Sequence, residues 1–264
     1  MNIFLRELKA NFKSLVIWGG IAILFASIGF SKFSAFEANT ELLAILDGMP
    51  PALLSAFNFN AFNLTTVTGF FGVMFTYFSL LLSVAAVMWG SEIITKEERD
   101  KTVEFSLTLP VPRSRLVTAK TLAAMVNCIG LLIITWGITL ANAAKYQPDS
   151  EFYEFLSLSI LALFIMQMIF LTVGIFLGCA MKQHKRASSV AVSLLLGTYF
   201  LSIIAGLNED LEFLKYFSPF KYFNPAKLLH ESKIEIVFVW VSAGIIAASL
   251  VGAYVSYSRR DLYI

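Results

Sequence analysis

The chain has 264 residues, of which 58% are hydrophobic and only 14% are charged. Soluble domains carry about 25% charged residues, so this composition, with a mean hydropathy of +0.74, excludes an ordinary soluble domain and indicates an integral membrane protein. The net charge of +2 is too small to indicate a nucleic-acid partner. The length fits a single transmembrane domain over residues 1–264, with about six spans in the lipid bilayer.

The first 13 residues predict an amphipathic elbow helix. Its apolar residues Phe4, Leu8 and Phe12 recur at every fourth position. Three basic residues follow another face: Arg6, Lys9 and Lys13. We expect this helix to lie along the membrane with its basic side toward the head groups. The alternative is the charged start of a signal peptide, which is disfavoured because no small-residue cleavage site follows.

Six apolar runs are long enough to cross a bilayer as helices. After the fifth run, residues 208–233 combine prolines with a dense group of aromatic side chains, which predicts short extracellular helices at the membrane interface. The expected fold class is an all-α membrane protein. The predicted spans cover about residues 14–31, 67–90, 121–144, 155–181, 187–207 and 236–257.

The second and third spans are separated by the most charged stretch of the chain, residues 91–116. A charge at the centre of a span costs about 2.5–3.5 kcal/mol, so this stretch is expected to face water. The run from Thr95 to Glu98 fits a capping box, a local helix start. Apolar pairs four residues apart then predict a helix from Arg99 to Leu109, ended by Pro110. A loop helix without a partner fits the same pattern.

Basic residues are unevenly divided between the two sides of the predicted membrane. Of the 20 lysines and arginines, 14 fall on the side that carries both termini and residues 91–116. The positive-inside rule places this side in the cytoplasm. The loop before the last span fits the rule least, because it holds four of the remaining six: Lys215, Lys221, Lys227 and Lys233.

The predicted spans contain no Asp, Glu, Lys, Arg or His. Proton-coupled carriers use such groups at membrane depth, so a self-powered carrier is disfavoured. The amides of Asn127 and Gln167 are candidates for a substrate path or for hydrogen bonds between helices. His184 and His230 lie in loops on opposite sides, and no phosphate-binding loop motif occurs. We therefore expect no catalytic residue, metal site or bound cofactor.

Two stripes of small residues lie within the spans, Gly174-xxx-Gly178 and Gly244-xxx-Ala248-xxx-Gly252. Such stripes let helix backbones approach closely. The sequence leaves open whether they pack within one chain or between two copies.

The stretch from Glu92 to Lys120 resembles the signature of ABC-2 type exporter permeases. The matching positions are Glu98, Arg99, Thr102, Glu104, Leu107, Pro110, Arg113 and Lys120. At two positions, Lys101 and Ala119, this chain departs from the glycine that the family often has. The six spans, the amphipathic start and the helical last outer loop are similar to the same family over the full length.

The resemblance implies a membrane-spanning subunit of an ATP-binding-cassette (ABC) exporter. Two permease copies, identical or different, would pair in the plasma membrane, expected to be bacterial, with their termini in the cytoplasm. Each copy would sit on an ABC ATPase subunit from a separate chain, which would hold ATP and magnesium. The substrate expected is hydrophobic or amphipathic: a peptide, a drug or a lipid.

In this family the segment after the second span is a coupling helix seated on the ATPase. The residues expected to contact the ATPase here are Glu98, Arg99, Thr102, Val103, Glu104, Phe105, Leu107, Pro110 and Arg113. The basic turn of Lys182, Lys185 and Arg186 is a candidate second contact, and an orientation signal beside anionic lipid is the equal alternative.

Two other functions fit the residues alone. A membrane anchor or sensor would bind a partner and transport nothing, whereas a stand-alone secondary carrier would show gradient-driven flux without an ATPase. Transport by vesicles that contain the purified complex would separate these three functions.

Overall fold

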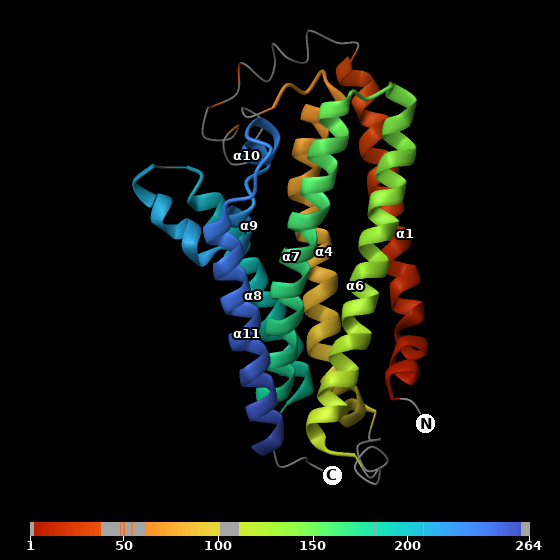
Figure 1. Ribbon diagram of the computed structural model, residues 1–264, viewed down its shortest axis with the longest axis vertical. Coiled ribbons are helices and arrows are strands. Elements are labelled where there is room, and N and C mark those ends of the chain that lie inside the picture. The colour runs from red at the N-terminus through yellow and green to blue at the C-terminus, as the bar shows by residue number, and fades with distance from the viewer. Residues whose placement is uncertain are drawn as a thin grey trace.

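A computed structural model shows the chain as an elongated bundle of helices (Figure 1). It describes residues 3–37, 62–100, 111–181, 183–207 and 209–259, together with residues 48, 50 and 54. Within these residues the regular structure is entirely helical. The end of the bundle where α1 begins and α11 ends, at the bottom of Figure 1, is called the lower end, and the opposite end the upper end.

Within the described residues, six helices are long and apolar enough to cross a membrane. Their bounds are α1 Ile3–Glu37, α4 Val67–Arg99, α6 Arg113–Ala143, α7 Ser150–Ala180, α8 His184–Ile204 and α11 Ile236–Arg259. A short 3-10 helix, η2 (Ala144–Tyr146), follows α6 directly. The prediction of an all-α membrane protein with six spanning helices is confirmed at this level.

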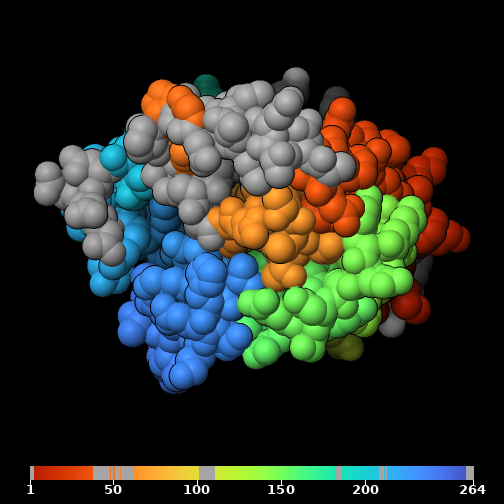
Figure 2. Space-filling model, turned by 90° about the horizontal axis from the view of Figure 1, so that it is seen from above, coloured from red at the N-terminus to blue at the C-terminus, as the bar shows by residue number. Residues whose placement is uncertain are grey.

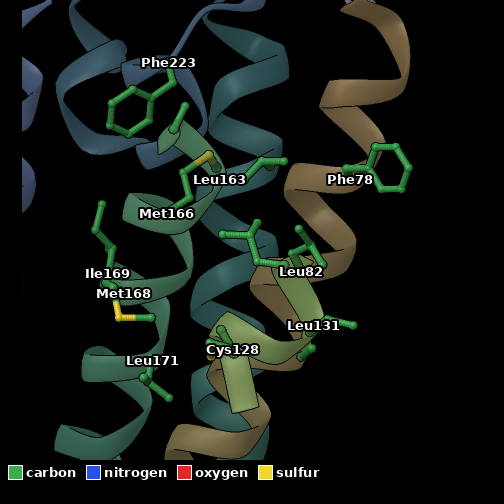
Figure 3. Packing of buried hydrophobic residues seen from close by; sticks show 14 of the residues in the cluster. Phe78, Leu82, Cys128, Leu131, Leu163, Met166, Met168, Ile169, Leu171 and Phe223 are labelled. Carbon is green, nitrogen blue, oxygen red and sulfur yellow. The ribbon is translucent and has the colours of Figure 1, made fainter. Parts of the chain in front are cut away.

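The helices α4 and α7 form the centre of the bundle, with α1 and α6 on one side and α8 and α11 on the other (Figure 1). The backbones of α4 and α7 approach closely because glycines lie at their contact. A Cβ on Gly174 of α7 would lie 2.6 Å from the Val87 carbonyl oxygen, and a Cβ on Gly90 of α4 would lie 2.2 Å from the Leu171 carbonyl oxygen. Around this contact lies one large apolar core, part of which is shown in Figure 3.

Local sequence explains where several helices begin. The Thr66 hydroxyl accepts a hydrogen bond from the Gly69 amide at 3.1 Å and caps α4. The Asp149 carboxylate does the same for α7, accepting from the Phe152 amide at 3.0 Å. Such caps satisfy amide groups that have no partner within the helix.

Short helices fill the chain between α8 and α11, as the sequence predicted. They are the 3-10 helix η3 (Glu209–Phe217), α9 (Pro219–Tyr222) and α10 (Pro225–His230). α9 and α10 each begin with a proline, whose fixed φ suits the first helical position. Figure 2 looks onto the upper end, where the start of α4 (orange) borders α1 (red), the turn between α6 and α7 (green) and the blue region that holds α10 and α11.

Two sequence-based helix boundaries differ from the structure. The residues predicted as a separate elbow helix, 1–13, belong from Ile3 onward to α1, which continues without a break to Glu37. Likewise α4 continues through Thr95 to Arg99, so Thr95 is not a helix start, and its hydroxyl donates to the Ser91 carbonyl at 2.8 Å. The chain near residue 13 contains no proline or glycine, and Gly90, at the predicted end of the second span, lies within α4 without interrupting it. Residues 101–110, which hold most of the predicted coupling helix, lie outside the described residues.

Candidate functional site

Five charged side chains from three helices meet at the lower end of the bundle. They are Arg6 and Glu7 of α1, Lys96 and Glu97 of α4, and Lys120 of α6. We call this group the ion network. It lies where α4 ends and α6 begins, on either side of residues 101–110.

Lys120 is the most deeply buried member of the ion network. Its side chain has no exposed surface. The ammonium donates a hydrogen bond to the Ile93 carbonyl oxygen at 2.8 Å and lies 3.2 Å from Glu97 Oε2. An ammonium removed from water costs several kcal/mol unless it is paired and hydrogen-bonded, and both conditions are met here.

Glu97 links Lys120 to α1. Its second oxygen, Oε1, accepts a hydrogen bond from Arg6 Nη2 at 2.7 Å. Glu7, also buried, pairs with Lys96 and lies 3.4 Å from Arg6 Nη2. The network therefore runs from α1 through α4 to α6 and, among the described residues, places three cations around two carboxylates.

Because most of these charges are buried, the network resists separation of the helices that carry it. Removing one partner of a buried ion pair leaves an uncompensated charge and destabilises a protein by about 3–5 kcal/mol. The arrangement therefore penalises any separation of the start of α1, the end of α4 and the start of α6. These helix ends form one charged unit, and residues 101–110 join α4 to α6 in the sequence.

Only three of the predicted ATPase-contact residues lie among the described residues. Glu98 is half-buried, while Arg99 is exposed and hydrogen-bonds to Asp100 at 3.0 Å. Arg113 is exposed at the start of α6, and its Nη1 donates to the carbonyl oxygens of Tyr257 at 3.4 Å and Ser258 at 3.3 Å. The other predicted contacts lie outside the described residues: Thr102, Val103, Glu104, Phe105, Leu107 and Pro110.

The contact of Arg113 with α11 was not predicted. It places a guanidinium against the last carbonyl groups of a helix, where a positive charge interacts favourably with the helix dipole. Of the predicted basic turn, Arg186 lies in the first turn of α8 and is exposed. Lys182 and the side chain of Lys185 lie outside the described part of the chain.

The two amides predicted for a substrate path or for interhelical bonding are both buried, Asn127 in α6 and Gln167 in α7. In the described part of the chain, Asn127 Nδ2 and both polar side-chain atoms of Gln167 have no hydrogen-bond partner. These amides therefore lie in the interior of the bundle with hydrogen-bonding atoms unused, and both predicted roles stay predictions.

Sequence reasoning missed the ion network as a unit. It assigned Arg6 to a face toward lipid head groups, and it placed Lys96 and Glu97 in a water-facing loop. The available signal was Lys120 at the edge of a long apolar run, because a charge there needs a partner. Nothing in the sequence alone identified Glu97 as that partner.

Comparison with known proteins gives one family. Residues 1–262 match a family model described as ABC-2 family transporter protein. A search of curated proteins found no relative that matches.

Proposed function

The chain belongs to the ABC-2 transporter family, and from this premise we propose that it is the permease subunit of an ABC exporter. ATP would be hydrolysed by a separate ATPase chain, and a second permease copy would complete the membrane unit. The substrate class proposed is a hydrophobic or amphipathic peptide, drug or lipid. The location proposed is the bacterial plasma membrane, with both termini in the cytoplasm.

The observation that carries this proposal is the family match over nearly the entire chain. The ion network supports it. A force applied to residues 101–110 would act on the end of α4 and the start of α6, and the buried pairs of Lys120, Glu97 and Arg6 would transmit it to α1. A rigid connection of this kind is what a subunit without its own energy source needs.

The proposal is tested with the permease co-expressed with its ATPase and reconstituted in vesicles. We expect the two chains to co-purify and the vesicles to transport substrate only with ATP. Flux driven by an ion gradient without the ATPase would instead identify a carrier, and a stable complex without flux would identify an anchor.

Charge reversals test the contact surface. We expect Glu104→Lys and Arg113→Glu to lower permease-dependent ATP hydrolysis, because reversed rim charges weaken the register of two partners. Arg115→Glu is the matched control for Arg113→Glu, since Arg115 is also exposed at the start of α6 and carries the same charge. Unchanged ATP hydrolysis in all three variants would overturn the assigned contact.

A further inference from the structure

Two pockets meet where the short helices between α8 and α11 pack on α4. Figure 1 shows α8, α9 and α11 grouped on the same side of the bundle. Lys221 of α9 and Asn224, the residue that caps α10, line both pockets. The two pockets therefore share one polar boundary, which we call the Lys221 site.

The Lys221 site presents two hydrogen-bond donors, the Lys221 ammonium and the Asn224 amide group. Among the described residues, no carboxylate or other acceptor forms a hydrogen bond or ion pair with the Lys221 ammonium. Asn224 uses its Oδ1 to accept from the Ala226 amide at 2.9 Å, which leaves the donor group Nδ2 for a ligand. Burial lowers the pKa of Lys221 because desolvation disfavours the charged form, so a bound anion would compensate an existing cost.

The other charged groups around the site add to its positive character. The second pocket is lined by Lys215 and Lys227 as well as Lys221, with Glu235 as the acidic residue. Lys227 is paired with Glu235 at 2.5 Å, so that carboxylate is already engaged. The described lining of this pocket therefore holds three lysines and one carboxylate, a composition that favours a phosphate or carboxylate ligand.

The first pocket supplies an apolar wall beside the donors. Phe75, Tyr199 and Phe220 line it. The ring of Phe220 packs edge-on against Tyr199 with 5.3 Å between centroids and lies at the same distance from Phe170. These contacts fix the start of α9, and with it the position of the next residue, Lys221.

We propose that the Lys221 site binds the anionic head of an amphiphile. The phosphate or carboxylate would accept hydrogen bonds from Lys221 and Asn224, and the apolar part would lie against the aromatic wall. The proposal does not depend on the transport function, because an acidic membrane lipid and an exported amphiphile share this chemistry. It gives a role to the basic residues in the loop that fits the positive-inside rule least.

Native mass spectrometry of the purified chain in a non-ionic detergent tests the proposal. The protein is titrated with phosphatidylglycerol and, separately, with phosphatidylcholine of the same acyl chains. We expect the wild type to bind the acidic lipid preferentially. We expect Lys221→Met to weaken that binding about tenfold or more, because a hydrogen bond to a charged group contributes about 1.5–3 kcal/mol.

Three variants control for loss of charge and for folding. Lys233→Met removes an exposed lysine of the same loop that does not line the site, and it should bind as the wild type does. Lys221→Arg should retain most of the binding. Gly206→Val should weaken it, because a Cβ on Gly206 would lie only 3.1 Å from Lys221 Nζ and would displace the ammonium.

The site is wrong if Lys221→Met and Gly206→Val, folded as judged by size-exclusion chromatography, bind phosphatidylglycerol as tightly as Lys233→Met does. If inorganic phosphate competes at the same concentration as the lipid, the ligand is not an amphiphile, since phosphate has no apolar part. Acidic lipid that co-purifies with the wild type and not with Lys221→Met would support the proposal with the bilayer as source. If the purified protein carries no lipid at this site and binds added palmitate, the proposal is supported and the bound amphiphile is assigned to a transported substrate.

Discussion

Lys120 carries a positive charge in the interior of a helix bundle, and its two contacts explain how that charge is tolerated. The Ile93 carbonyl and Glu97 both belong to α4, so a residue of α6 is held by two successive turns of a neighbouring helix. The predicted third span begins one residue later, at residue 121. The sequence thus placed Lys120 at the boundary of an apolar run, whereas its side chain reaches back into the protein and not toward water.

We expect Lys120→Met to destabilise the folded chain, toward the lower part of the range of about 3–5 kcal/mol for breaking a buried pair. The lower part applies because Arg6 still pairs with Glu97. Thermal unfolding in detergent measures the effect. Lys9→Met, which removes an exposed charge from α1, should change stability by no more than about 0.5 kcal/mol.

Adding Glu97→Gln to Lys120→Met should recover part of the lost stability, because the buried carboxylate that has lost the Lys120 ammonium is then replaced by a neutral amide. If Lys120→Met unfolds at the same temperature as Lys9→Met, the ion network contributes nothing to stability.

The lysines around the Lys221 site should titrate at different pH values. Burial lowers the pKa of Lys221. Its neighbour Lys227 has a raised pKa, chiefly because of its hydrogen bond to Glu235. Only the neutral amine reacts with an acylating reagent, so the midpoint of modification with rising pH should be lower for Lys221 than for Lys227. Peptide mass spectrometry after brief labelling measures both, and reversed midpoints would contradict the local environments described for these residues.

At the scale of elements, the contact between α4 and α7 depends on the absence of side chains. The stripe of Gly174 and Gly178 predicted a close approach, and the structure places both against α4 of the same chain. The second stripe behaves differently: Gly244 faces open space, while a Cβ on Gly252 would lie 2.8 Å from the Phe176 ring. The pattern alone could not distinguish these cases, because the face that a helix presents to its neighbours is decided by tertiary packing.

We expect Gly174→Val to destabilise the bundle by about 1–3 kcal/mol or more, because the added atoms meet the Val87 backbone, which cannot move aside as a side chain can. Gly137→Val is the matched control, since nothing lies within 4 Å of a Cβ at that position. Unfolding temperatures in detergent compare the two variants. Equal temperatures would show that α4 and α7 tolerate a wider separation.

Sequence reasoning predicted the existence of the long helices better than their ends. The six spans follow from uninterrupted apolar runs, which only helices can carry across a bilayer. The first turns of α1 and the last turns of α4 were not predicted as parts of these helices, because Arg6 was assigned to the membrane surface and Glu97 to water. Their long-range pairing, across 91 residues of sequence, lets both helices continue beyond the apolar runs. Local patterns contain no information about such a pair.

At the scale of the whole molecule, the two ends of the bundle have different chemistry. The lower end combines the ion network with exposed basic residues such as Arg99, Arg113 and Arg186. The short helices lie in the upper half of the bundle, and the Lys221 site lies there between α9 and α4, below the upper end itself (Figure 1). The positive-inside rule predicts that the lower end faces the cytoplasm. The proposed function requires the same orientation, because an ATPase that uses cellular ATP must reach residues 101–110.

Cysteine labelling in intact cells tests this orientation directly. The native Cys128 and Cys179 are both buried, so they should give little background. Ser114→Cys adds an exposed thiol at the lower end, and Ser232→Cys adds one beyond α10 at the upper end. We expect a membrane-impermeant maleimide to label Ser232→Cys in intact cells and Ser114→Cys only after the membrane is opened. The opposite pattern would place residues 101–110 outside the cell, where no ATP-driven partner could act on them, and the proposed function would fall with the orientation.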